Sequence, residues 1–174
     1  MLSQRMIDAL NEQFKNEMYS SYLYLSMSAY FSRLNLNGFA NWMRIQAKEE
    51  DAHAMKLYQY VLEQRGRMEV RAIAQPPADY ASPLVVFQHT RDHEKNVTAM
   101  INGLVAMARE ENDNATESFL KWYVDEQVEE ESNVDQVLQQ LEIVGNDGTS
   151  LFMLDKEMAA RVFTPVVGVM GRMA

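Results

Sequence analysis

Four long segments of the chain carry apolar residues at steps of three and four. This spacing gathers the apolar side chains on one face of an α-helix, whereas a half-buried strand would show strict alternation. Ser3, and Ser82 followed by Pro83, are typical helix starts, because a hydroxyl accepts a bond from a free N–H group and proline fits the first turn. The predicted helices span about residues 3–33, 37–66, 82–111 and 115–144.

The connections between these segments predict how the helices are arranged. Residues 35–38 and 112–114 are rich in Asn, Asp and Gly, which suit tight turns. Residues 67–81 contain Pro76 and Pro77 and are numerous enough to run from one end of a helix bundle to the other. Gly66 is predicted to end the second helix in a left-handed conformation, and a short fifth helix is predicted after Thr149 or Ser150. The fold class is therefore an all-α four-helix bundle with one long crossover and a short fifth C-terminal helix.

Composition limits the possible partners and the compartment. The 174 residues include no cysteine, which excludes disulfides and thiolate metal sites and suits a reducing cytoplasm. We expect a cytoplasmic protein, because the N-terminal residues lack the apolar segment of an export signal. A net charge of -9 disfavours nucleic acid, and no apolar run reaches the roughly 20 residues of a membrane-spanning helix.

Each predicted core stripe is interrupted by side chains that can bind metal ions. The interrupting residues lie at similar distances from the starts of their helices, so at 1.5 Å per residue they could meet in one layer. Glu94, for example, takes a position between Thr90 and Val97 on an otherwise apolar face. The set is Glu17 in the first helix, Glu50 and His53 in the second, Glu94 in the third, and Gln127 and Glu130 in the fourth.

A buried layer of carboxylates needs positive charge. An unpaired buried carboxylate costs several kcal/mol, and no Lys or Arg lies on these stripes. A structural ion-pair network is therefore disfavoured, and cations are the expected partners. Oxygen ligands with a single imidazole favour Fe or Mn, and two divalent ions would nearly neutralise the layer. Paired redox metals imply electron transfer.

The chain resembles the non-haem bacterial ferritins over about residues 1–160. The segments that carry the resemblance are 11–13, 17–24, 49–53, Glu94 and 122–131. The resemblance implies a ferritin-like domain over 1–160, followed by a C-terminal tail of unknown role over 161–174. It also implies a homo-oligomeric shell of 24 subunits around a ferric mineral. Haem is not expected, since Asp51 stands where bacterioferritins place the haem-ligating methionine.

The resemblance also assigns roles within the layer. It implies that Glu17, Glu50 and His53 bind a first iron and that Glu50 bridges to a second. Glu94 and Glu130 resemble the ligands of this second iron. The resemblance further implies Gln127 as their polar neighbour, Tyr24 as a donor of an electron or a hydrogen bond, and a third, weaker outer site at Glu49, Glu126 and Glu129 with Glu130 shared.

The function that follows is iron storage with ferroxidase activity, in which O2 or H2O2 oxidises Fe(II). A di-metal oxidoreductase without storage is the alternative, since it would use the same ligands. A metal-free acidic bundle is a third possibility. His89 and His93 have the spacing of a metal clip, but with no third ligand in view they are interpreted as an exposed pair.

Overall fold

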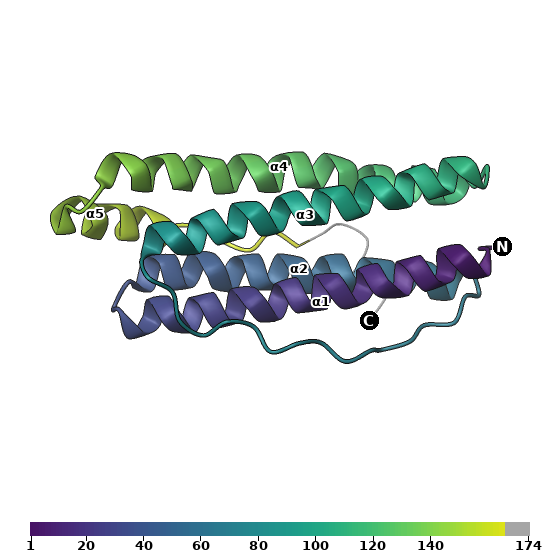
Figure 1. Cartoon of the computed structure of the whole chain (residues 1–174), viewed down its shortest axis with the longest axis horizontal. Helices are drawn as coiled ribbons and strands as arrows, with labels where there is room; N and C mark the ends of the chain where they lie inside the picture. The colour runs from purple at the N-terminus through teal and green to yellow at the C-terminus, as the bar shows by residue number, and fades with distance from the viewer. Residues whose placement is uncertain (166–174) are drawn as a thin grey trace.

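The protein is described by a computed structural model in which residues 1–165 form five α-helices and no strand (Figure 1). The predicted all-α class, the crossover and the short fifth helix are thus confirmed. None of the helices in this part of the chain has the length and hydropathy needed to cross a membrane. The helices are α1 (Gln4–Arg33), α2 (Asn37–Glu63), α3 (Pro83–Glu110), α4 (Asn114–Val144) and α5 (Gly148–Met158).

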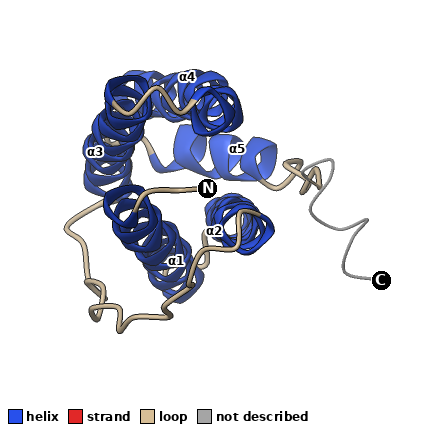
Figure 2. Cartoon of the chain, turned by 90° about the vertical axis from the view of Figure 1, so that its right-hand side faces the viewer, coloured by secondary structure: helices blue, strands red, loops and turns tan. Residues whose placement is uncertain are grey.

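The helices form two pairs. α1 packs on α2 and α3 packs on α4, while α1 also contacts α3, which joins the pairs into one bundle (Figure 2). The connection over residues 64–82 runs along α1 to the opposite end of the bundle (Figure 1). Asn11 of α1 holds it at two points, because its side chain donates to Arg67 O at 2.9 Å and accepts from Glu69 N at 2.8 Å.

Side-chain caps begin four of the five helices. Ser3 and Ser82 act as predicted, accepting bonds from the N–H groups of Met6 and Val85. Asp113 caps α4, accepting from Thr116 N at 3.0 Å. For α5 the cap is Asp147, so the helix begins at Gly148, slightly before the predicted start.

The prediction that Gly66 ends the second helix in a left-handed conformation is wrong. The helix ends at Glu63, and the residue with positive φ is Arg65, at 58°. Gly66 is needed for a different reason. A Cβ atom there would lie 2.8 Å from Val61 Cγ1, so the position requires close approach rather than a special φ.

The fifth helix packs on α2 and α4 near the start of α2. A Cβ at Gly38 would lie 1.5 Å from the carbonyl oxygen of Asp155, and the Asp155 carboxylate accepts from Phe39 N at 2.9 Å. The predicted domain boundary at residue 160 falls directly before Arg161, whose side chain packs on α2. Residues 166–174 of the predicted tail lie outside the described residues.

Two apolar clusters fill the bundle, and a polar layer separates them. One cluster contains residues 23–31 of α1 and 134–141 of α4, while the other contains residues 6–14 of α1 and 120–123 of α4. α2 and α3 contribute to both clusters in the same way. The core is thus interrupted at one level of the bundle, which is where the sequence places its buried carboxylates.

Candidate metal centre

The interruption in the core is a layer of six buried polar side chains, called the polar layer below. Each is only 1–4% exposed. Buried charged residues at one level of a bundle are rare unless they are paired or bind metals. Its members are Glu17 from α1, Glu50 and His53 from α2, Glu94 from α3, and Gln127 and Glu130 from α4.

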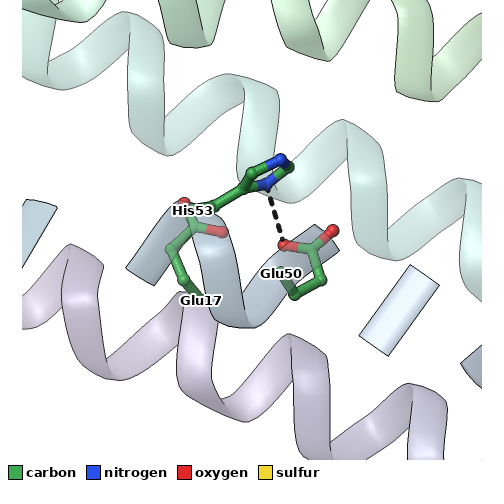
Figure 3. Close-up of side chains that lie close together, drawn as sticks. All are labelled: Glu17, Glu50 and His53. Atoms are coloured by element: carbon green, nitrogen blue, oxygen red, sulfur yellow. Dashed lines mark ion pairs between the residues drawn. The ribbon is translucent and has the colours of Figure 1, made fainter. Parts of the chain in front are cut away.

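The α1–α2 side of the polar layer brings Glu17, Glu50 and His53 together (Figure 3). His53 Nδ1 lies 3.4 Å from Glu50 Oε2, and one ligand atom from each of the three residues lies within 4.8 Å of the others. Glu50 and His53 share a helix face because they are three residues apart. Gln13 donates to Glu17 Oε1 at 2.7 Å.

Two potential ligand atoms on this side have no hydrogen-bond partner among residues 1–165, namely Glu17 Oε2 and His53 Nε2. Most buried polar atoms in proteins are hydrogen-bonded, and leaving one unsatisfied costs about 1–3 kcal/mol. The donor set of two carboxylates and one imidazole fits a divalent cation. A cation bound here would satisfy the free carboxylate oxygen and supply the missing positive charge.

On the α3–α4 side, both carboxylates accept hydrogen bonds from neighbouring side chains. Glu94 accepts from the Tyr24 hydroxyl and from Gln127 Nε2, the latter at 3.2 Å. The same Gln127 amide nitrogen also donates to the backbone carbonyl oxygen of Glu94 and to Thr98 Oγ1, each at 3.3 Å. Glu130 Oε2 accepts from Gln46 Nε2 at 2.6 Å. A metal ion bound by Glu94 or Glu130 must therefore compete with these donors.

Burial and mutual repulsion change the protonation of the layer. Burial, together with the charge of Glu50, raises the pKa of the Glu17 carboxyl well above its usual range. Burial opposes the charge on Glu50 as well, but His53 lowers the pKa of that carboxyl. Burial likewise opposes charge on His53, yet Glu50, Glu126 and Glu17 raise the pKa of its imidazole well above its usual range. In the metal-free protein these pKa shifts favour an ionised Glu50, a protonated Glu17 and a charged imidazolium at His53.

The pKa values of the carboxyls on the second side of the layer are raised as well. Burial, then repulsion from Glu50 and Glu130, raises the pKa of Glu94 well above its usual range. Burial, then repulsion from Glu50, raises the pKa of Glu130 to about 8. Within residues 1–165, no Lys or Arg forms an ion pair with these carboxylates or with Glu17. The raised pKa values therefore favour the neutral, protonated carboxyls, which need no basic partner.

The three residues of the predicted outer site differ in burial and in their distance from the polar layer. Glu126 Oε1 lies 3.8 Å from His53 Nε2, and His53, Glu126 and Glu130 form a second group whose ligand atoms lie within 4.8 Å of one another. Glu49 is partly buried and bound to Arg161, while Glu129 is exposed. Neither Glu49 nor Glu129 belongs to either group. The structure thus brings Glu126 to the polar layer and leaves the other two apart from it.

Some residues that support the layer did not stand out in the sequence. Gln13 and Gln46 are buried and donate to Glu17 and Glu50, each four residues further along its helix. Glutamine one turn before an inward carboxylate is the signal that could have found them. His93 was interpreted as exposed, but it is only partly so. Its ring meets the Tyr24 ring edge-on at 5.9 Å, and its Nε2 lies 2.8 Å from Ser20 Oγ.

The fold and the layer together define a class of protein, the four-helix bundles with one long crossover and a carboxylate-rich core. Comparison with known proteins narrows this class. Residues 7–144 match the family described as "Ferritin-like domain". The chain is 39% identical over 163 residues to the bacterial non-heme ferritin of Staphylococcus aureus strain USA300, an alignment that covers 94% of this chain and 98% of the relative.

Solved structures agree with this result. An open-pore ferritin from the hyperthermophilic archaeon Archaeoglobus fulgidus is 48% identical and has a TM-score of 0.92, covering 93% of this chain and 100% of that one. A closed form of that ferritin, engineered by site-directed mutagenesis, gives a TM-score of 0.93 at 48% identity, covering 94% of this chain and all of that one. The chain belongs to the ferritin family.

Proposed function

We propose that this protein stores iron and has ferroxidase activity, with Fe(II) oxidised at the polar layer. The observation that carries the proposal is the pair of buried atoms without a hydrogen-bond partner, Glu17 Oε2 and His53 Nε2. They lie in a carboxylate layer with which no Lys or Arg of the described residues forms an ion pair. Membership of the ferritin family supports iron as the metal.

In this proposal, Glu17, Glu50 and His53 bind the first Fe(II), and Glu50 bridges to the second. Glu94 and Glu130 bind the second Fe(II) after giving up the bonds that they accept from other side chains. Gln127 and Tyr24 remain beside the second position. Tyr24 is fully buried, and its hydroxyl donates to Glu94, so it is placed to pass a hydrogen bond or an electron to the layer.

Protons and cations compete in the layer. The proton on His53 must leave before its imidazole can bind a metal, and the proton on Glu17 leaves as its carboxylate does so. Two Fe(II) ions supply two electrons, which O2 takes up with two protons to give H2O2. Alternatively, the two electrons and two protons convert one H2O2 into two water molecules. We expect Fe(II) binding to release protons and to weaken as pH falls.

Storage requires an enclosing assembly, and we propose a cytoplasmic shell of 24 copies of this chain around a ferric mineral. The third cation position, at Glu49, Glu126 and Glu129, is proposed as a weaker outer site. Because Glu126 also lies near His53, this outer site would adjoin the polar layer directly. Below, "outer site" means these three residues.

The test is an anaerobic Fe(II) titration followed by exposure to oxygen. We expect two tightly bound Fe(II) per subunit, a rise in near-ultraviolet absorbance on oxidation, and a large particle with an electron-dense core. Glu50→Ala should lose tight binding, whereas Glu142→Ala, which removes an exposed glutamate of α4, should behave as the parent. Tight Fe(II) binding and oxidation in a small particle would contradict the storage function but not the ferroxidase activity. The absence of tight Fe(II) binding would contradict the whole proposal.

A further inference from the structure

The segment after α5 places one arginine against the outer side of the polar layer. Arg161 Nη2 donates to Glu49 Oε2 at 2.5 Å, and Nη1 donates to Gln46 Oε1 at 2.8 Å. The guanidinium carbon lies 4.1 Å from the centre of the Trp42 ring. The Asn41 side chain donates to Arg161 O at 3.0 Å, which anchors the main chain of this segment.

The three side chains that contact the Arg161 guanidinium all lie on α2. Trp42, Gln46 and Glu49 are spaced by four and three residues, so one face of the helix presents a ring, an amide oxygen and a carboxylate to the same guanidinium. The ion pair is largely shielded, with side-chain exposures of 17% for Arg161 and 16% for Glu49. Solvent and salt screen such a shielded pair less than an exposed one, which contributes little.

Gln46 links this arginine to the polar layer. Because its Oε1 accepts from Arg161, its Nε2 faces inward and donates to Glu130 at 2.6 Å and to Glu50 at 3.3 Å. Arg161 is therefore one side chain away from two proposed iron ligands. Among residues 1–165, its guanidinium is the basic group paired with the carboxylate of Glu49.

We propose that Arg161 is a tethered counter-cation at the outer site, and that a metal ion must displace it to use Glu49. This inference rests on the proposed function. A divalent ion and a guanidinium cannot share one partly buried carboxylate without strong repulsion. The C-terminal segment thereby makes the outer site weaker than the inner positions. Displacement also removes the group that bonds to Gln46 Oε1, so filling the outer site loosens an amide that contacts Glu50 and Glu130.

The first test observes displacement directly in the intact protein. The chain has two tryptophans, so a Trp122→Phe background leaves Trp42 as the only indole. Zn(II), which is redox-inert, is added while Trp42 emission and bound metal are followed together. We expect emission to stay constant while the inner positions fill and to change when the outer site fills, because the guanidinium then leaves the Trp42 ring.

The second test removes the charge. Arg161→Met keeps an unbranched side chain over Trp42, and we expect it to bind outer Zn(II) at least about 10-fold more tightly than the parent. Arg161→Lys keeps the positive charge beside Glu49 and should bind outer Zn(II) about as weakly as the parent. Arg33→Met is the matched control, because Arg33 also combines an ion pair, with Asp79, and an aromatic partner, Tyr30. It should leave the outer affinity unchanged.

The outcomes separate this inference from the proposed function. Suppose that the inner positions bind Zn(II), but Trp42 emission stays constant while the outer site fills and Arg161→Met does not tighten outer binding. The proposed role of Arg161 is then disproved, and the proposed function stands. If the parent shows no inner binding, the proposed function fails first. Should Arg161→Met fold poorly, the emission titration still decides, because it uses the native arginine.

Discussion

On the α1–α2 side of the polar layer, Glu17 Oε2 and His53 Nε2 are buried without a hydrogen-bond partner in the part of the chain that the structure describes. On the α3–α4 side, by contrast, Glu94 and Glu130 accept bonds from neighbouring side chains. A ligand atom without a partner gains its full interaction with a cation, whereas a bonded one must first give up a donor. The comparison implies an order of filling, in which the first cation enters beside α1 and α2 and the second must displace hydrogen bonds.

The largest expected effect comes from removing ligands on one side at a time. Glu17→Ala should weaken binding of the first Fe(II) by at least about 100-fold, because even groups behind metal ligands contribute about 10–100-fold. Glu94→Ala should spare that first step and abolish the second. Anaerobic Fe(II) titration of both variants measures this. Equal loss of both steps in the two variants would show that the sides fill together and not in order.

The α1–α2 pair also packs against α5 through α2, and this contact leaves no space for a side chain at Gly38. In Gly38→Ala the new Cβ would lie 1.5 Å from Asp155 O, so α5 must move. Strain of this kind costs about 3 kcal/mol. We expect lower resistance to urea and faster hydrogen exchange at Phe39 N–H, which donates to Asp155. Parental exchange at that amide would mean that α2 and α5 separate without cost.

Loss of protons from the polar layer should make the metal-free fold less stable as pH rises. The raised pKa values of Glu17, Glu94 and Glu130 mean that the folded protein keeps protons that the unfolded chain releases. For Glu130 the loss of stability accumulates between its ordinary pKa of 4.5 and about 8. His53 acts in the same direction, since its stabilising charge is lost as pH rises through its raised pKa.

Thermal melts of the metal-free protein therefore should show a midpoint about 5 °C or more lower at pH 8.5 than at pH 5.5. Glu130→Gln, which cannot ionise, should reduce this difference, and Zn(II) should reverse it by replacing the protons. A midpoint that rises steadily across this range would show that the layer is ionised in the absence of metal.

The level of the polar layer was predictable because a helix converts sequence position into depth at a constant rise. Glu17, Glu50 and Glu94 interrupt apolar stripes, and this pattern was sufficient to place them inside. Arg161 could not be found in this way, because it lies in a segment without helical period beyond α5. Nor could the role of Gly66 be inferred, because close packing against Val61 depends on tertiary contact and not on local preference.

Glu94 shows how hydrogen bonds alter an estimate made from the sequence. Replacing a buried carboxylate by leucine can be neutral or stabilising, so the sequence alone predicts a metal-free Glu94→Leu at least as stable as the parent. The structure shows that Tyr24 and Gln127 would both lose an acceptor. We now expect a destabilisation of about 1–3 kcal/mol, and less for Glu94→Gln, which keeps an acceptor. Urea unfolding of the two metal-free variants distinguishes these estimates.

The smallest expected effect concerns a glycine in the other helix pair. Gly103 lies within α3, is exposed, and has no atom within 4 Å of where a Cβ would stand. Alanine there should stabilise the protein by about 0.5–1 kcal/mol, because glycine loses more backbone freedom in a helix. Gly103→Ala is thus the matched control for Gly38→Ala, with the same chemical change and the opposite sign. If both substitutions destabilised the protein equally, the clash at Asp155 would not be the cause at Gly38, and the added methyl group itself would have to be.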